Sequence, residues 1–208
     1  MSSLIKRIRN ERLVFECNFK ENDMYNEMIF AGFGGQGIMT IGQIIAYVGM
    51  NEGRAVAWIP SYGPEMRGGT ANCTVVVTDQ DRVGAPMTTQ PDWVIAMNNP
   101  SFAKFEPKVK PGGLMVYNES LISHKPNRDD IKYIPVKANE LAKDLGNERY
   151  AAIICMATLV GYTDIINIEM VSEALKKVLP DRYHELIPDN MKAAMSGYEI
   201  GKNSRNGK

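Results

Sequence analysis

The sequence has few cysteines, and none of them lie close together. Cys17, Cys73 and Cys155 are its three cysteines, and no C-x-x-C spacing occurs in the 208 residues. Iron–sulfur and structural zinc sites need closely spaced cysteine ligands, so the sequence offers no ligand set for either. Isolated thiols are typical of reduced, buried cysteines in a cytosolic protein. We therefore expect a cytoplasmic location.

An excess of charge and a long apolar run are also missing. Lysine plus arginine number 24, as do aspartate plus glutamate, so the formal net charge is zero. A neutral balance gives no electrostatic reason to expect nucleic acid or an anionic membrane as a partner, and it favours association with other proteins. Apolar runs are interrupted within about ten residues, which is too short for a membrane span.

Residues for acid–base or nucleophilic chemistry are scarce. His124 and His184 are the only two histidines, they are far apart in sequence, and no serine lies in a G-x-S-x-G motif. A free-standing enzyme needs an acid, a base or a nucleophile in a recognisable arrangement. The sequence therefore identifies no catalytic residue and no metal ligand.

The length and composition predict one globular domain with appendages. Hydrophobic residues make up 44% of the chain and charged residues 23%, which is ordinary for a globular protein. Residues 1–27 are rich in charge and are expected to form a peripheral or mobile extension. Residues 28–197 form the predicted domain. The polar end of the chain predicts a disordered tail over 198–208.

Short apolar strands alternate with amphipathic helices through this domain. Strands are predicted at 27–31, 55–59, 71–78, 93–97, 114–118 and 131–136, and helices at 38–50, 101–107, 139–145, 149–161, 168–178 and 182–196. This alternation indicates an α/β fold of three layers, with a mostly parallel, Rossmann-like sheet and C-terminal helices.

A glycine-rich loop follows the first strand and opens a helix. It reads Gly32-x-Gly34-Gly35-Gln36-Gly37, a pattern that lets backbone approach a phosphate at a helix N-terminus. The nicotinamide fingerprint also needs an acid at the end of the next strand, and that strand ends at Trp58–Ser61 without one. Two interpretations remain open: a tight structural turn, or a loop that faces a phosphate-bearing ligand held mainly by a partner chain. In the second, Gln36 is the polar side chain.

A second glycine-rich loop spans Ser61–Thr70 and joins two predicted strands. Its Arg67 can clamp a phosphate or carboxylate, whereas the alternative is a local ion pair with Glu65 that braces the loop. The candidate binding residues in this loop are Ser61, Tyr62, Glu65, Arg67, Gly68 and Gly69. Loops of this kind in α/β sheets lie at the ligand crevice.

Asn98 is the last candidate binding residue. It follows the predicted strand 93–97, at the edge of the sheet where the ligand crevice is expected. There it either reaches the crevice or ends the strand by local hydrogen bonds.

Four segments together resemble a known family. They are Ala31–Gly37, Ser61–Cys73, Asn98–Ser101 and Lys110–Gly113, and they are similar to the gamma subunit of 2-oxoacid:ferredoxin oxidoreductases. The resemblance covers about residues 28–197 and is strongest to the 2-oxoglutarate and branched-chain (2-oxoisovalerate) enzymes.

The resemblance implies one subunit of a larger enzyme, inactive alone. Such an enzyme oxidatively decarboxylates a 2-oxoacid with coenzyme A and yields an acyl-CoA, carbon dioxide and reduced ferredoxin. It implies no cofactor bound by this chain alone; thiamine diphosphate with Mg²⁺, iron–sulfur clusters and coenzyme A belong to the assembled complex. The implied partners are alpha and beta subunits and ferredoxin, with a small ferredoxin-like delta subunit left open. Gly34–Gly37 and Tyr62–Gly69 would then face a crevice shared with those subunits.

Two alternatives from other classes stay open beside this resemblance. One is a stand-alone nucleotide-binding dehydrogenase, against which the missing acid counts. The other is a purely structural scaffold subunit whose loops only brace its partners.

Overall fold

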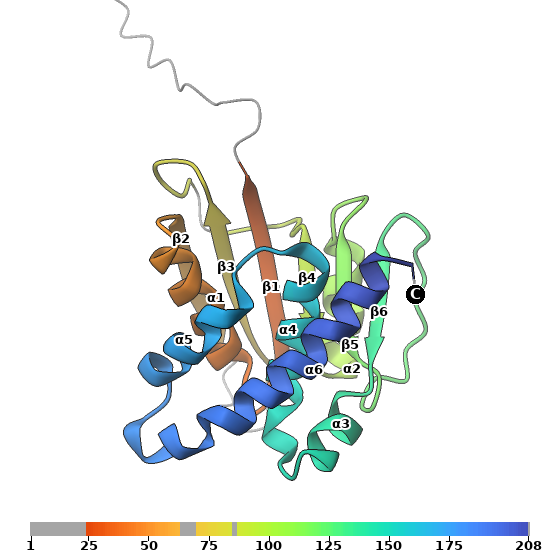
Figure 1. Ribbon diagram of the computed structural model, residues 1–208. Coiled ribbons are helices and arrows are strands. Elements are labelled where there is room, and N and C mark those ends of the chain that lie inside the picture. The colour runs from red at the N-terminus through yellow and green to blue at the C-terminus, as the bar shows by residue number, and fades with distance from the viewer. Residues whose placement is uncertain (1–23, 63–69, 85–86, 208) are drawn as a thin grey trace, which may run out of the picture.

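The computed structural model describes residues 24–62, 70–84 and 87–207, which build a six-stranded sheet with helices on both faces (Figure 1). The strands are β1 (Tyr25–Phe33), β2 (Ala55–Tyr62), β3 (Thr70–Thr78), β4 (Trp93–Ala96), β5 (Leu114–Asn118) and β6 (Lys132–Val136). The helices are α1 (Ile38–Asn51), α2 (Asn99–Phe105), α3 (Ala138–Asp144), α4 (Ala151–Thr163), α5 (Val171–Val178) and α6 (Ile187–Arg205). Short 3₁₀ turns are η1 (Glu106–Lys108), η2 (Glu148–Tyr150), η3 (Ile168–Met170) and η4 (Asp181–Leu186).

The sheet is mostly parallel, as the sequence predicts. Its strand order is β2-β3-β1-β4-β5-β6, and β1, β4, β5 and β6 pair in parallel. By contrast, β3 is antiparallel to both β1 and β2. The predicted alternation of strands and helices does not specify this arrangement. It agrees with the short connection from β2 to β3, because residues 63–69 are fewer than a parallel crossover needs.

Alternate residues of β1 point into two separate cores. Met28 and Phe30 are fully buried under the helices α1 and α4, whereas Ile29 and Ala31 pack on the opposite face with Phe102 of α2. This alternation follows from the two-residue period of a strand. In Figure 1, α4 and α6 cross in front of the sheet and α2 lies behind it, so the three-layer prediction is confirmed.

Helix α1 packs closely on the sheet. The apolar face predicted from the spacing of Ile38, Ile41 and Ile44 is buried. A β-carbon added at Gly42 would lie 2.6 Å from the Sγ atom of Cys73, so only glycine permits this approach. Gly42 therefore allows the close contact between α1 and the sheet.

Helix α6 extends beyond the predicted helix and contradicts part of the predicted tail. It packs on α4 through Gly197 and Gly201, at which an added β-carbon would lie 2.2 Å from the carbonyl oxygen of Ile154 and 2.1 Å from that of Thr158. The chain is helical through Arg205, and Gly201 is buried. The prediction of disorder is thus wrong for 198–205, because these glycines are contact surfaces between two helices rather than helix breakers.

The N-terminal boundary also differs from the prediction. Strand β1 begins at Tyr25, so Tyr25–Glu27 belong to the sheet rather than to an extension. Residues 1–23 lie outside the described residues. None of the helices in the described part of the chain has both the length and the apolar character that a membrane crossing requires.

The Lys110–Gly113 segment is a turn that holds together the starts of β4 and β5. Gly112 has a φ of +78°, and a β-carbon on Gly113 would lie 2.4 Å from the carbonyl oxygen of Asp92. The Nζ atom of Lys110 lies 2.9 Å from a carboxylate oxygen of Asp92 and 3.2 Å from one of Glu27. Asp92 also accepts a hydrogen bond of 2.8 Å from the backbone N–H of Glu27. This fourth segment of the resemblance is therefore structural.

The ion cluster of Lys110 predicts a pH-dependent contribution to stability. Burial opposes the charged form of Lys110, but hydrogen bonds to Asp92 and Glu27 outweigh it and raise the pKa above its ordinary value of 10.5. A raised lysine pKa stabilises the fold below the unfolded pKa and ceases to do so as pH rises through the folded one. We expect Lys110→Met to cost about 1 kcal/mol at pH 8, a loss that shrinks above pH 10.5, in urea denaturation of the full chain.

Lys192→Met is the matched control. Lys192 pairs with Asp189 at 2.8 Å, but both side chains are largely exposed, so its loss should leave the unfolding free energy unchanged. An equal effect of the two substitutions would contradict the structural role of the Lys110 cluster.

Candidate functional site

The predicted binding segments meet at one edge of the sheet. In the antiparallel pairs, Phe33 at the end of β1 lies opposite Thr70, and Tyr62 lies opposite Ala71. The residues Gly34–Gly37, here called the glycine loop, follow Phe33 directly. This is the edge at which the parallel strands end, where α/β sheets bind ligands.

The Ser61–Thr70 loop is described only at its two ends. Ser61 is exposed at the end of β2 and Thr70 is exposed at the start of β3. Glu65, Arg67, Gly68 and Gly69 lie outside the described residues, and their binding roles remain predictions. The register of β2 and β3 nevertheless places both ends of the loop at the edge that carries the glycine loop.

The side chain of Gln36 faces back into the protein. Its Oε1 atom accepts hydrogen bonds from the backbone N–H of Phe33, at 2.6 Å, and from Nδ2 of Asn98, at 3.3 Å. Its Nε2 atom donates to the carbonyl oxygen of Met97, at 3.3 Å. Gln36 therefore ties the glycine loop to the ends of β1 and β4. The sequence suggests an amide that faces a ligand, whereas in the structure the amide makes its hydrogen bonds within the chain.

Asn98 has a positioning role in the same network. It is only 3% exposed, and its Oδ1 atom accepts a hydrogen bond of 2.9 Å from the N–H of Ser101, which caps α2. Its Nδ2 atom donates to Gln36. Both side-chain polar atoms are thus used within the protein, which favours the interpretation that Asn98 ends the strand and braces the glycine loop.

The glycine loop has the backbone shape of an anion-binding turn. Gly35 and Gly37 have φ angles of +96° and +79°, which side chains rarely adopt. A β-carbon on Gly32 would lie 2.7 Å from Oε1 of Gln36, so this glycine makes room for the Gln36 network. Sequence reasoning identified the glycines, but the network depends on the carbonyl of Met97, directly after β4, which no local pattern shows.

Helix α1 starts without a side-chain cap. Its N-cap is Gly37, no side chain accepts a bond from its first turn, and no acidic residue lies in that turn. The N–H groups of the first turn and the positive end of the helix dipole remain available for an anion. The residues present therefore fit a phosphate group. The interpretation of this loop as one that faces a phosphate-bearing ligand stays open.

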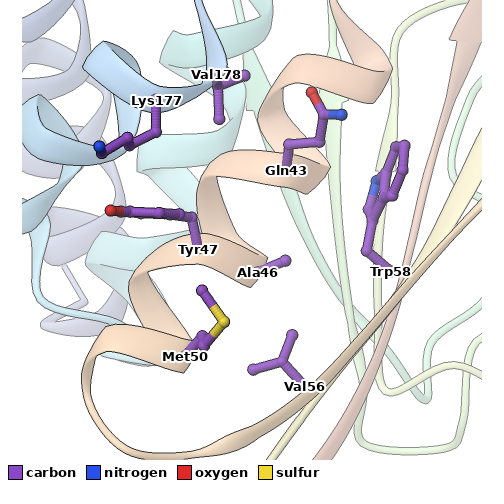
Figure 2. A pocket seen from close by; sticks show the side chains of 8 residues that line it. All are labelled: Gln43, Ala46, Tyr47, Met50, Val56, Trp58, Lys177 and Val178. Atoms are coloured by element: carbon purple, nitrogen blue, oxygen red, sulfur yellow. The ribbon is translucent and has the colours of Figure 1, made fainter.

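One hollow of the described surface lies away from the glycine loop. Figure 2 shows this shallow groove of about 400 Å³ between the second half of α1, the edge strand β2 and the end of α5. Tyr47, Met50, Val56 and Trp58 give it mostly apolar walls, and Lys177 is the one charged residue that lines it. No carboxylate, histidine, cysteine, serine or threonine lines it, so the groove shows no acid–base pair and no activated nucleophile.

The described thiols and His124 lie in surroundings that do not favour catalysis. Burial raises the pKa of both Cys73 and Cys155 to about 12, so both stay protonated at neutral pH and are poor nucleophiles. His124 is exposed and is held by Oδ1 of Asn99, 2.8 Å from its Nδ1 atom. Within the ranges that the structure describes, no three histidine, cysteine, aspartate or glutamate side chains gather in a way that could hold a metal ion.

Comparison with known proteins shows which family has this arrangement. The family model described as pyruvate ferredoxin/flavodoxin oxidoreductase matches residues 27–200. This range includes the whole sheet except the start of β1, both candidate loops and most of α6.

Several curated relatives are subunits of 2-oxoacid oxidoreductases. Ketoisovalerate oxidoreductase subunit VorA of Methanothermobacter marburgensis is 38% identical over 65% of this chain, and that of Methanothermobacter thermautotrophicus is 33% identical over 85%. The chain spans only 28% and 36% of the length of these two relatives. The 2-oxoglutarate synthase subunit KorC of Methanocaldococcus jannaschii is 27% identical, and the match covers 89% of this chain and 98% of KorC.

Solved structures share the fold. The gamma subunit of keto/oxoacid ferredoxin oxidoreductase from Geobacter sulfurreducens superposes with a TM-score of 0.70 at 26% identity, over 85% of this chain and 98% of that one. The 2-oxoglutarate:ferredoxin oxidoreductase from Magnetococcus marinus, solved with 2-oxoglutarate, coenzyme A and succinyl-CoA bound, has a TM-score of 0.77 at 22% identity. This match covers 86% of this chain and 31% of that one. Because the family model covers most of the chain and a solved gamma subunit matches it almost end to end, this chain belongs to the pyruvate ferredoxin/flavodoxin oxidoreductase family of oxidoreductases, with the fold of its gamma subunits.

Proposed function

We propose that this chain is the gamma subunit of a thiamine diphosphate-dependent 2-oxoacid:ferredoxin oxidoreductase. The observation that carries the proposal is the nearly end-to-end match to KorC and to a solved gamma subunit, together with two candidate loops at one edge of the sheet. The complex would oxidatively decarboxylate a 2-oxoacid and transfer the acyl group to coenzyme A, with ferredoxin as the electron acceptor.

The other subunits complete the enzyme in this proposal. Alpha and beta subunits, with a small ferredoxin-like delta subunit as a further candidate, hold thiamine diphosphate with Mg²⁺ and the iron–sulfur clusters. When bound, these groups supply the decarboxylation chemistry and carry the electrons to ferredoxin. This chain contributes binding and positioning, which agrees with its protonated thiols. We place the complex in the cytoplasm.

The role of this chain follows from the glycine loop. The free N–H groups at the start of α1 bind a phosphate of coenzyme A, and Gln36 and Asn98 keep the loop in the required shape. Arg67, from the loop that returns to the same edge, binds a second anionic group or braces the pocket. Each of these roles holds or orients a ligand and transfers no proton.

The proposed substrate is 2-oxoglutarate or a branched-chain 2-oxoacid. The curated relatives named for 2-oxoglutarate match this chain almost end to end, whereas those named for ketoisovalerate match at higher identity over part of a longer protein. The names of the relatives therefore support both substrates.

A stand-alone dehydrogenase is disfavoured by the order of the strands. In dinucleotide-binding folds, the strand after the first helix lies beside the first strand and ends in an acid for the ribose. Here β3 separates β2 from β1, and β2 ends in Ser61-Tyr62. A nicotinamide cofactor on the glycine loop would find no such acid.

Isolation of the native complex tests the proposed function. The chain should co-purify with thiamine- and cluster-binding subunits, and the complex should reduce a viologen with coenzyme A and either 2-oxoglutarate or 2-oxoisovalerate. A panel of 2-oxoacids identifies the substrate. A complex that lacks thiamine- and cluster-binding chains would disprove the proposal.

Arg67→Ala tests binding by the Ser61–Thr70 loop. Loss of a charged hydrogen bond to coenzyme A should raise the KM for coenzyme A about tenfold in the assembled complex. Arg82→Ala, at an exposed position after β3, is the matched control and should leave this KM unchanged. Loss of assembly in Arg67→Ala supports the scaffold alternative, and unchanged KM and turnover would exclude a role in binding.

Gln36→Ala tests the positioning network. It removes the bonds to Phe33, Met97 and Asn98, so we expect the KM for coenzyme A to rise about fivefold while turnover at saturation falls less. Asn99→Ala is the control, because the Asn99 side chain bonds only to Ser123 and His124 in the described structure. If both variants changed KM equally, the network would have no specific role in positioning the loop.

A further inference from the structure

A cavity of about 250 Å³ lies beside the glycine loop on the helical face of the sheet. It is enclosed by the first half of α1, the start of α4, the helix α5, the turn η4 and the start of α6. Gly35 and Gly37 form part of its wall. Its volume is slightly below that of pockets for drug-sized ligands, which fits a smaller molecule.

The inner part of the cavity is apolar. Ile41 and Ile44 of α1, Ile153 of α4 and Leu175 of α5 line it. Each of these four side chains is at least 96% buried. A ligand that fills this part must therefore have an aliphatic or similarly apolar body, because an unpaired polar group would lose its hydration there.

Hydrogen-bond donors line the same cavity. Tyr150 is 4% exposed, and its hydroxyl has no hydrogen-bond partner among the described residues. The hydroxyl of Thr40 is likewise free, whereas the helical threonines Thr158 and Thr163 each donate to the carbonyl four residues before them. Thr40 is only partly buried, and neither hydroxyl is sealed from solvent, so both are donors that a ligand in the cavity can use.

The charge at the cavity is positive. The exposed Arg149 lines it, and none of its described lining residues is acidic. The first turn of α1 contains no acidic residue and no side-chain cap. Helix α4 lies beside it, since a β-carbon on Gly37 would be 3.1 Å from that of Ala152, but α4 continues from η2, which is capped by Asn147 and begins with Glu148. The donors and the uncapped start of α1 therefore favour an anion at this point.

We propose that this cavity binds an amphipathic anion, an aliphatic carboxylate. The carboxylate lies beside Arg149 and accepts hydrogen bonds from Thr40 and Tyr150, and the aliphatic chain lies among Ile41, Ile44 and Leu175. This site is additional to the proposed function and does not depend on it, because every group that forms it belongs to this chain.

Calorimetric titration of the full chain with octanoate tests the site. Octanoate should bind with a dissociation constant in the submillimolar range, whereas octanol, which lacks the charge, and acetate, which lacks the chain, should each bind at least tenfold more weakly. Binding of acetate or octanol as tight as that of octanoate would overturn the proposal, as would the absence of octanoate binding.

Two substitutions locate the binding within the protein. Arg149→Gln should weaken octanoate binding about tenfold, and Tyr150→Phe about threefold. Arg82→Gln is the matched control, because Arg82 is also an exposed arginine but lies after β3 and outside the cavity, and it should bind octanoate as the unmodified chain does. Equal binding by Arg149→Gln and Arg82→Gln would overturn the proposal.

The outcome is separable from that of the proposed function. Octanoate titration uses the chain alone and needs no turnover, whereas the gamma-subunit proposal depends on co-purification and viologen reduction. Thermal unfolding of each variant without ligand shows whether it is folded. Arg149→Gln should melt at the temperature of the unmodified chain, because it removes an exposed side chain. A loss of octanoate affinity in a folded variant therefore reports on the site itself.

Discussion

The position of β3 between β1 and β2 is the constraint on which the candidate site depends. Because β3 is antiparallel to both neighbours, the connection from β2 must return at the edge where β1 ends, beside the glycine loop. The same arrangement separates β2 from β1 and removes the neighbouring strand that carries the ribose-binding acid in dinucleotide folds. One pairing therefore brings two glycine-rich loops together and changes the ligand that the first of them can accept.

The side-chain amides of Gln36 and Asn98 convert this arrangement into a defined loop shape. A backbone with φ angles of +96° and +79° at Gly35 and Gly37 has little intrinsic preference for one conformation, so external bonds must select it. Gln36 supplies them by contacting the ends of both β1 and β4. Asn98 couples the loop to the cap of α2 on the opposite face of the sheet. The polar side chains near the loop thus act on its geometry.

Local patterns predicted much of the fold, because the period of apolar residues reports directly on burial. The buried face of α1 and the strand Leu114–Asn118 follow from such periods. The antiparallel β3 and the long α6 do not, since they depend on partners distant in sequence. Gly201 shows the reason: glycine in a polar segment resembles a helix breaker, and only the carbonyl of Thr158 on α4 reveals a contact. The direction of Gln36 likewise depends on Met97, sixty-one residues away.

The glycine loop and the cavity share two residues, and this links their ligands physically. Gly35 and Gly37 shape the uncapped start of α1 and also form the wall of the cavity. A ligand that fixes the φ angles of these glycines therefore fixes part of that wall, and a ligand in the cavity restricts the loop in turn. Thermodynamic linkage requires such an effect to be reciprocal. Like charges attracted to the same helix end repel each other, so two anions would bind there with mutually reduced affinity.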